Sequence, residues 1–241
     1  AVGVAKRGAM TVIRNSPRPK LHWQTVAMDG LATKQSNAAG ELHGWWWSET
    51  LQPIAATRRP RTDAILRTLL ARYLPLPSAA LRFGREARGR PYLVDDGAPD
   101  FNLSDTGGGC VLAVAAGGRV GIDIERCDRA LPVVRLAERW FAGDEALAPR
   151  ALDAETARRA FLRLWTAKEA SCKATGTGIF GRLAEWRFAI DAHIPEPVAL
   201  PPEAGSVGRW RFHRLTPAAT HTVALACQDL AADPQGFVVC P

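Results

Sequence analysis

Apolar residues recur along the chain with two different periods, and each period predicts a different kind of element. Spacings of three and four positions over Asp63–Leu74 predict an amphipathic helix, which Pro75 ends. The same spacing predicts three later helices, over Pro132–Trp140, near Asp144–Leu147 and over about Ala154–Ala174. In the last of these, Phe161, Leu164 and Trp165 form the predicted buried stripe, and Gly176 and Gly178 predict the end of the helix.

Short runs rich in aromatic and β-branched residues predict strands. The first is the aromatic segment His43–Trp47, and the last is the apolar run His221–Cys227. Between them we expect strands at Leu81–Phe83, Tyr92–Val94, Phe101–Leu103, Val111–Ala116, Val120–Glu125, Ala184–Ile190 and Arg209–Leu215. The Gly117-Gly118 pair predicts a two-residue hairpin between the strands at 111–116 and 120–125.

The order of these elements predicts an α+β protein built from two halves. Each half has one principal helix and a small, mostly antiparallel sheet, without strict βαβ alternation and without a GxGxxG or Walker loop. We expect a poorly ordered lead at 1–40, an N-terminal half at 41–118, a C-terminal half at 119–228 and an irregular tail at 229–241.

Three carboxylates in the C-terminal half point to chemistry. On a strand, Asp123 and Glu125 face the same way, and two adjacent carboxylates repel unless they share a cation. Glu169 follows Trp165 by one helical turn, and Lys173 follows Glu169 by one more. The carboxylate oxygens suit Mg²⁺, which completes its shell with water and substrate phosphates. The alternative is that the acidic pair is merely solvated at a strand edge.

Positive charge is concentrated in one segment. The net charge is +7, and Arg58 to Arg90 holds nine arginines against two acids, a balance that by itself equals +7. Such a field attracts phosphates or an acidic protein, and the alternative is a solvated arginine-rich surface. A nucleic-acid-binding domain would rest on this segment alone, because no nucleic-acid motif accompanies it.

The remaining composition narrows the class of protein. No apolar run approaches the ~20 residues of a membrane helix, and no apolar segment follows Lys6 and Arg7, so we expect neither membrane insertion nor a secretory signal. The five cysteines are far apart and form no CxxC pair, which predicts reduced thiols in a cytoplasmic protein.

Four sequence blocks then occur in a distinctive order. They are Gly89-Arg90-Pro91, Phe101-Asn102-Leu103-Ser104, Gly121-Ile122-Asp123-Ile124-Glu125 and Trp165-Thr166-Ala167-Lys168-Glu169-Ala170, the last continued by Lys173-Ala174 and Gly176-x-Gly178. Over about residues 43–227 the chain resembles the Sfp-type 4′-phosphopantetheinyl transferases. The resemblance implies a monomer whose two halves are related by a pseudo-twofold axis, with the active site between them.

The resemblance also implies an activity. The family transfers the 4′-phosphopantetheine arm of coenzyme A to a serine of an acyl or peptidyl carrier protein, as a holo-[acyl-carrier-protein] synthase does, and releases adenosine 3′,5′-bisphosphate. The implied Mg²⁺ ligands here are Asp123, Glu125 and Glu169, and Glu169 is also the implied base. Lys173 is the implied second catalytic residue, which contacts the transferring phosphate and assists the leaving group. The other implied positions against coenzyme A are Arg90, Ser104, Asp105 and Arg58, the last with Arg59 or Arg61 as alternatives.

One residue departs from the family pattern. Asp105 stands where the family usually has a histidine that faces phosphate, and an acid there would be repelled by a diphosphate unless it binds Mg²⁺, is protonated or turns away. The second hypothesis is therefore a relative that binds coenzyme A or a carrier protein without transferring the arm.

Overall fold

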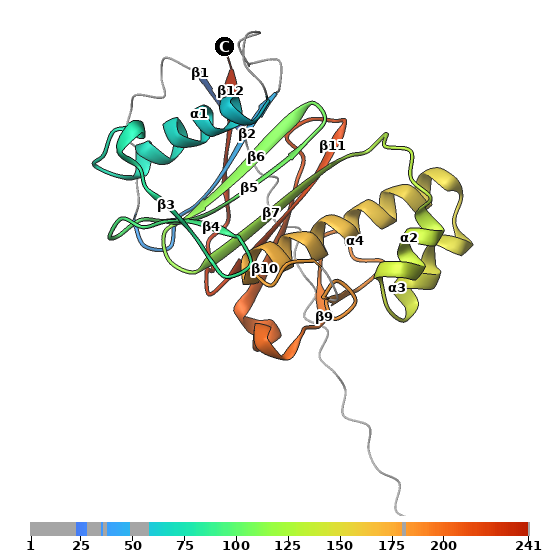
Figure 1. Ribbon diagram of the computed structural model, residues 1–241. Helices are drawn as coiled ribbons and strands as arrows, with labels where there is room; N and C mark the ends of the chain where they lie inside the picture. Colours follow the sequence, from blue (N-terminus) through green and yellow to red (C-terminus); the bar gives the residue numbers. More distant parts are fainter. Residues whose placement is uncertain (1–22, 28–34, 36–37, 49–57, 180–181, 241) are drawn as a thin grey trace, which may run out of the picture.

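The structure is a computed structural model that describes residues 23–27, 35, 38–48, 58–179 and 182–240, with the backbone alone for residues 58–61. It is an α+β protein with two main sheets and two principal helices, as Figure 1 shows. The first sheet has the spatial order β1 (Trp23–Ala27), β12 (Gln235–Cys240), β2 (Leu42–Ser48), β6 (Gly109–Ala115) and β5 (Asp100–Thr106). The second has the order β10 (Trp210–Leu215), β11 (His221–Gln228) and β7 (Arg119–Arg126).

Four α-helices are present in the described part of the chain, at the predicted places. They are α1 (Arg58–Leu70), α2 (Val133–Trp140), α3 (Asp144–Leu147) and α4 (Ala154–Thr175). The first begins five residues earlier than predicted and is followed by the 3-10 turn η3 (Ala71–Tyr73) before Pro75. Further 3-10 turns are η4 (Ser78–Ala80), η5 (Ala148–Ala151), η6 (Pro202–Ala204) and η7 (Val207–Arg209). Two small hairpins complete the fold, β3 (Phe83–Arg85) with β4 (Pro91–Leu93), and β8 (Arg187–Phe188) with β9 (Pro197–Ala199).

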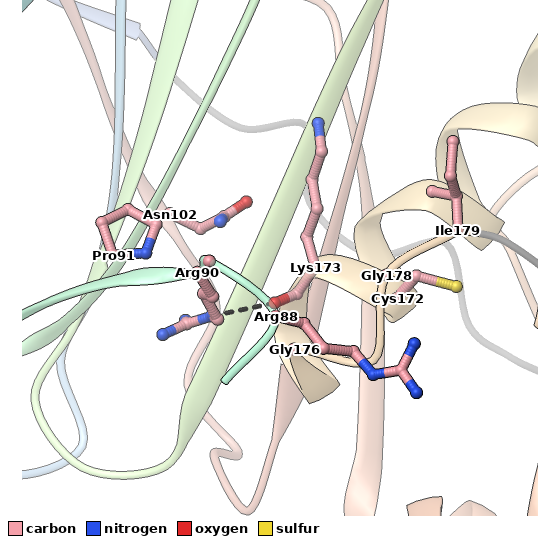
Figure 2. Close-up of a pocket in the computed structure, with 10 residues that line it drawn as sticks. Arg88, Arg90, Pro91, Asn102, Cys172, Lys173, Gly176, Gly178 and Ile179 are labelled. Atoms are coloured by element: carbon pink, nitrogen blue, oxygen red, sulfur yellow. Dashed lines mark hydrogen bonds between the residues drawn. The ribbon is translucent and has the colours of Figure 1, made fainter. Parts of the chain in front are cut away.

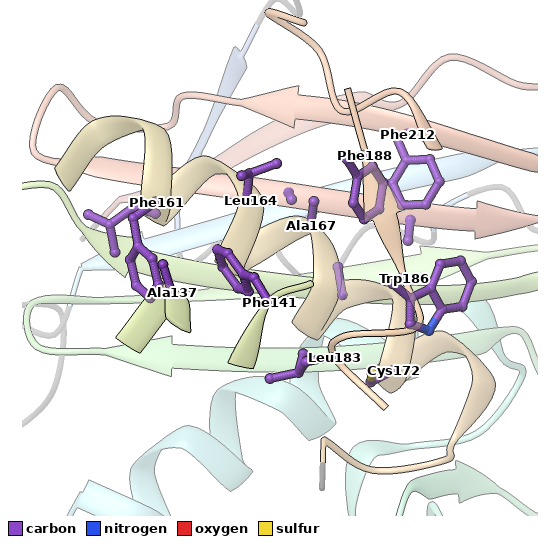
Figure 3. Close-up of a cluster of buried hydrophobic side chains, with 14 of the residues drawn as sticks. Ala137, Phe141, Phe161, Leu164, Ala167, Cys172, Leu183, Trp186, Phe188 and Phe212 are labelled. Atoms are coloured by element: carbon purple, nitrogen blue, oxygen red, sulfur yellow. The ribbon is translucent and has the colours of Figure 1, made fainter. Parts of the chain in front are cut away.

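The hydrophobic core has three parts, which follow the layers. The apolar stripe of α1 packs on the first sheet around Trp45 and Trp47. The apolar side of α4 packs on the second sheet, where Phe141 stacks on Phe161 with ring centroids 5.1 Å apart (Figure 3). Trp165, expected in the buried stripe, is only partly buried. The third part lies between the two sheets, where the sheet faces that point away from the helices pack together. There Val111 and its neighbours contact the apolar side of β7.

A buried ion pair crosses the core beneath α4. Nζ of Lys168 lies 2.8 Å from Oε2 of Glu145, and neither side chain is exposed to solvent. Lys168 also donates hydrogen bonds to the carbonyls of Leu183 and Trp186, and the carboxylate of Glu145 accepts one from the N–H of Phe188. These bonds satisfy two charges that would otherwise be costly to bury. They attach α3 and residues 183–188 to the middle of α4.

The two halves have the same connectivity. In the first, a strand (β2) leads to a helix (α1) and two more strands (β5, β6), and the order in space is β5–β6–β2. In the second, β7, α4, β10 and β11 follow in the same way, with the order β10–β11–β7. The pseudo-twofold axis expected between the halves stays a prediction.

The hairpin predicted at Gly117-Gly118 is wrong. Both glycines do turn the chain, with φ of 89° and 75°, but β6 and β7 then enter different sheets. The reason is that β2 pairs with one edge of β6 and β5 with the other, so that β6 has no edge left for β7. Instead, β7 pairs with β11, antiparallel, from Arg119 opposite Gln228 to Arg126 opposite His221.

Side chains, in place of a backbone ladder, join β5 to β7 where the two sheets meet. Asp100 and Asn102 lie two positions apart on β5 and therefore point the same way. Oδ2 of Asp100 accepts a hydrogen bond from the N–H of Val120 at 2.8 Å, and Oδ1 of Asn102 accepts one from the N–H of Ile122 at 2.9 Å. The position of β7 relative to β5 is thus set by particular side chains.

Both ends of the described chain correct the predictions. The tail expected to be irregular contains β12, which lies between β1 and β2 and runs parallel to both. Phe237 and Val239 lie two positions apart and are both buried, as expected of a strand with one face on the core. That face packs on the first core cluster, which is the part of the core between α1 and the first sheet. In the predicted lead, residues 23–27 form β1, while residues 1–22 lie outside the described residues. The division into halves at 41–118 and 119–228 stays a prediction.

Candidate active site

Gly121 allows α4 to lie directly on β7. A Cβ at this position would fall inside the 3.0 Å limit of real Cβ contacts, against the carbonyl oxygen of Ala170 and the amide nitrogen of Ala174. Only a residue without a side chain leaves room for this approach. Asp123 shares the face of Gly121, since side chains alternate along a strand. The close packing therefore brings the acids of β7 to the last two turns of α4.

Lys173 connects three of the predicted site residues. Its Nζ lies 2.6 Å from Oδ1 of Asp123, 2.9 Å from Oγ of Ser104 and 3.9 Å from Oε2 of Glu169. Oγ of Ser104 also donates a hydrogen bond to Oδ1 of Asp123 at 2.9 Å. Strand β5, strand β7 and helix α4 thus each contribute to one cluster of polar side chains.

Burial and the charge of Asp123 raise the proton affinity of two neighbouring glutamates. Burial, followed by the charge of Asp123, raises the pKa of Glu169 to about 7, although Lys173 opposes the shift. Burial and Asp123 also raise the pKa of Glu125, although Arg129 donates hydrogen bonds to both of its oxygens, at 2.9 and 3.0 Å. A carboxyl group with a pKa near 7 can take up and release a proton at neutral pH, as a general base must.

The residues present fit a hard cation by their chemistry. Oδ2 of Asp123 is buried and has no hydrogen-bond partner among the described residues, so one carboxylate oxygen is left for a ligand. Glu125 and Glu169 stand beside it with raised pKa values, which a divalent cation would lower. Within the described part of the chain, no group of three or more histidine, cysteine, aspartate or glutamate side chains is already arranged around a metal position.

A cavity of about 210 Å³ opens next to this cluster (Figure 2). One wall is the turn from Arg88 to Pro91, between β3 and β4, and the other is the end of α4 with Gly176, Gly178 and Ile179. Arg88 is exposed, and Lys173 lies at the side where the cavity meets the acidic cluster. The cavity therefore combines an apolar lining with cationic groups, which suits a nucleotide or another phosphorylated ligand.

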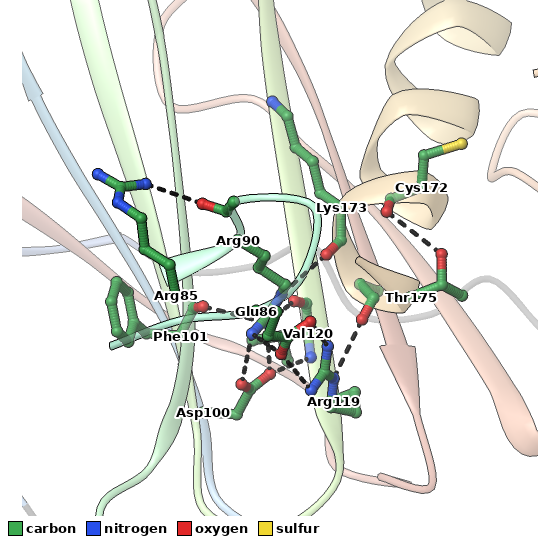
Figure 4. Close-up of polar contacts among 12 residues, drawn as sticks. Arg85, Glu86, Arg90, Asp100, Phe101, Arg119, Val120, Cys172, Lys173 and Thr175 are labelled. Atoms are coloured by element: carbon green, nitrogen blue, oxygen red, sulfur yellow. Dashed lines mark hydrogen bonds and ion pairs between the residues drawn. The ribbon is translucent and has the colours of Figure 1, made fainter. Parts of the chain in front are cut away.

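Arg90, a predicted phosphate contact, lines the cavity but is already engaged by the protein. Its side chain is 4% exposed, and Figure 4 shows it among acceptors from three elements. It donates to both carboxylate oxygens of Asp100, at 2.9 and 2.7 Å, and to the carbonyls of Lys173, Phe101 and Val120, at 2.9, 3.1 and 2.9 Å. Since a guanidinium has five N–H groups, little donor capacity is left for a phosphate.

Asp105 lies on the opposite face of β5 from Ser104. The alternation of the strand places it in line with Phe101 and Leu103, which pack on the first core cluster, and at the end of the strand it is exposed. Its side of the strand is therefore not that of the Asp123 cluster. Of the alternatives weighed for this residue, the geometry favours the one in which it turns away.

Some predicted contacts cannot be compared with the structure, and others were missed. The side chains of Arg58, Arg59 and Arg61 lie outside the described residues. Among the residues that the sequence reasoning missed are Arg129 and Arg88. Arg129 carried no signal, because a spacing of four predicts contact on a helix, whereas Glu125 lies on β7 and a turn brings Arg129 back to it. Arg88 belonged to the basic segment but could not be told apart from its neighbours.

Comparison with known proteins shows the family. The model described as the 4′-phosphopantetheinyl transferase superfamily matches residues 119–226, which include Asp123, Glu125, Glu169 and Lys173. The 4′-phosphopantetheinyl transferase HetI of Nostoc sp. is 30% identical over 215 residues, which cover 88% of this chain and 86% of that protein. The chain belongs to the 4′-phosphopantetheinyl transferase superfamily. The resemblance noted in the sequence is thereby confirmed.

Two further relatives in this superfamily match shorter stretches. The 4′-phosphopantetheinyl transferase Sfp of Bacillus subtilis is 26% identical over 173 residues, 71% of this chain and 75% of that protein. A Synechocystis sp. relative is 34% identical over 149 residues, 61% of this chain, and the match spans about three fifths of that relative's length, 59%.

In the part of the chain that the structure describes, no helix has both the length and the apolar character needed to span a bilayer.

Proposed function

We propose that the protein transfers the 4′-phosphopantetheine arm of coenzyme A to a serine hydroxyl of an acyl or peptidyl carrier protein. The observation that carries the proposal is the joining of Asp123, Glu169 and Lys173 in one cluster, at the side of a cavity with cationic groups. Membership of the superfamily supports the same activity. The type of reaction is that of a holo-[acyl-carrier-protein] synthase.

In the proposed reaction, the serine oxygen attacks the phosphorus that carries the pantetheine arm. A new P–O bond to serine forms, and the bond from that phosphorus to the bridging oxygen breaks, releasing adenosine 3′,5′-bisphosphate. Glu169 takes up the serine proton, directly or through water, as the base that a serine hydroxyl needs. Lys173 places a positive charge at the cluster, where it would balance charge developing on the leaving phosphate.

Asp123, Glu125 and Glu169 would hold Mg²⁺, and Oδ2 of Asp123 accepts no hydrogen bond from any described residue. When bound, Mg²⁺ would neutralise part of the diphosphate charge as the P–O bond breaks. The chain's own residues have a separate task, which is to keep the carboxylates, Ser104 and Lys173 within reach of one another.

We place the adenosine bisphosphate end of coenzyme A in the cavity between the 88–91 turn and the end of α4. Arg88 is better placed than Arg90 to bind a phosphate there, because Arg88 is exposed whereas the donors of Arg90 are taken up by Asp100 and backbone carbonyls. Arg58, with Arg59 or Arg61 as alternatives, stays a proposed contact to the nucleotide. An acidic carrier protein would be attracted by the basic segment.

The decisive experiment is intact-mass measurement of carrier proteins. Purified protein with Mg²⁺ and coenzyme A should add about 340 Da, the mass of the arm, to an apo-carrier. A panel of acyl and peptidyl carriers is needed, each first shown to be modified by a known transferase. Glu169→Gln, which keeps the shape of the side chain, should abolish the shift. Wild-type protein that modifies no member of the panel would refute the proposal.

The alternative, binding without transfer, rested on Asp105. The exposed position of this residue, on the face of β5 opposite to Ser104, does not favour it. We retain as proposals a monomeric state, which gel filtration with light scattering would test, and a cytoplasmic location. The pseudo-twofold relation of the halves is retained in the same way.

A further inference from the structure

The last turn of α4 is held by two arginines that lie outside the helix. The helix ends at Gly176, whose φ of 70° turns the chain away. Carbonyl groups at a helix C-terminus lack partners within the helix, and positive side chains are favourable there. Nε of Arg90 donates to the carbonyl of Lys173 at 2.9 Å, and Nε of Arg119 donates to the carbonyl of Ala174 at 3.1 Å.

Arg119 also reaches the turn that forms the opposite wall of the cavity. Its terminal nitrogens lie 2.7 and 3.1 Å from the two carboxylate oxygens of Glu86, a bidentate pair (Figure 4). Glu86 begins the turn, because its N–H bonds to the carbonyl of Arg90 and its carbonyl accepts from the N–H of Gly89. The guanidinium of Arg119 therefore links the two walls of the cavity, one of which comes from each half of the protein.

The space around Gly176 is shaped to this pair. A Cβ at Gly176 would collide with Oε2 of Glu86 and would lie 3.6 Å from a terminal nitrogen of Arg119. The carboxylate of Glu86 thus packs against the backbone that ends the helix. Both side chains are half-buried, at 27% and 37% exposure, so water competes only in part for their bonds.

We propose that Arg119 and Glu86 are positioning residues, which fix the distance between the 88–91 turn and the end of α4 and so keep the coenzyme A cavity open to the right width. The proposal rests on the proposed function, because it assigns the cavity to coenzyme A. Arg119 acts through Ala174 and Glu86, and not by contact with the reacting atoms. Arg90 keeps its bonds to Lys173, Asp100 and Val120 when Arg119 is absent. Loss of Arg119 therefore frees the Glu86 end of the turn and affects Lys173 less.

The test compares coenzyme A binding with turnover in three variants. Arg119→Met keeps the length of the side chain but removes the cap and the ion pair. It should raise the Kd and KM for coenzyme A by about tenfold, because the freed turn must be ordered on binding, and change kcat much less. Arg119→Lys, which keeps the charge but places all its donors on one nitrogen, should lie between Arg119→Met and wild type.

The charge swap, Glu86→Arg with Arg119→Glu, separates the two roles of Arg119. It restores an ion pair but sets a carboxylate against the carbonyl of Ala174, so we expect no rescue of coenzyme A binding. Arg150→Met is the matched control, since it removes a surface ion pair in which Arg150 donates two hydrogen bonds to Glu138, between α2 and the η5 turn that precedes α4. It should lower the melting temperature slightly and leave the KM for coenzyme A unchanged.

The outcomes distinguish the two proposals. Calorimetric titration of wild-type protein with coenzyme A comes first, and absence of binding would overturn both the proposed function and this inference. Binding by wild type, with an unchanged Kd and KM in Arg119→Met, would overturn the inference alone. A rise in KM that the Arg150→Met control shares would also overturn the inference. Rescue by the charge swap would do the same, because it would assign the effect to the ion pair and not to the cap on Ala174. If Arg119→Met does not fold, Arg119→Lys and Glu86→Gln carry the same comparison.

Discussion

Replacing Gly121 by alanine should separate the acids of β7 from α4. The added Cβ would overlap the carbonyl oxygen of Ala170 by about 1 Å relative to the 3.0 Å limit of real contacts. Neither side can yield locally, because Gly121 is paired with Ala226 of β11 and the carbonyl belongs to the interior of a helix. The helix must therefore move as a unit by about 1 Å, carrying Glu169 and Lys173 away from the strand.

The expected loss follows from that displacement. Misplacing reacting groups by about 1 Å can cost ~100-fold in rate, and overpacking a core costs about 1–3 kcal/mol of stability. We expect Gly121→Ala to lower kcat for transfer by roughly 100-fold at saturating coenzyme A. Its free energy of unfolding, measured with urea, should fall by about 2 kcal/mol, which still leaves most molecules folded.

Gly208→Ala is the matched control, because no atom lies within 4 Å of a Cβ added there. It should change neither the rate nor the stability measurably. A Gly121→Ala protein that turns over at the wild-type rate per folded molecule would show that the position of α4 on β7 does not limit the reaction. A crystal structure of the variant would then reveal which backbone had yielded.

Three further predictions concern other parts of the molecule. Lys168→Met should lower the free energy of unfolding, measured with urea, by about 3–5 kcal/mol, because it leaves Glu145 charged and buried. Adding Glu145→Met should recover most of that loss, and equal stability of the single and double variants would contradict the prediction. Asp105→His should change the transfer rate by less than about tenfold, since this residue faces away from Ser104, and a larger gain would restore the hypothesis of an impaired enzyme. Burial acts to raise the pKa of Glu86, but hydrogen bonds and charge from Arg119 outweigh it, and the net pKa is lowered. The carboxylate therefore stabilises the fold at pH values above its ordinary pKa, and this stabilisation is lost as the pH falls through the lowered pKa. The difference in unfolding free energy between wild type and Glu86→Gln should therefore shrink in acid, and a difference that grew in acid would refute the assignment.

The sequence predicted the elements of this fold better than their partners. The helix over 154–174 and the strand over 120–125 are visible from local spacing, and so is the common face of Asp123 and Glu125. The pairing of β6 was not visible, because the Gly-Gly signal describes a turn and says nothing of which edges are already occupied. The same reasoning missed β12, whose partners lie about two hundred residues earlier in the chain.

The candidate site was predicted in part for a similar reason. Short motifs carried Asp123, Glu169 and Lys173, and the structure brings these residues together. They could not show that the N–H groups of Arg90 donate to Asp100 and to backbone carbonyls, since those acceptors come from separate strands and a helix end. Nor could they show why residue 121 is a glycine. The reason is that α4 crosses β7 too closely at Gly121 to leave room for a side chain.

The place of β12 between β1 and β2 has a consequence for biosynthesis. On the ribosome, residues 23–115 emerge well before residues 235–240. Among the described strands, however, β1 is hydrogen-bonded to the sheet only through β12. The first sheet must therefore wait, with one edge of β2 unpaired, until the second half of the molecule has been made. A nascent chain at this stage exposes a strand rich in tryptophan, and pairing between such chains is the aggregation hazard that this order of assembly creates.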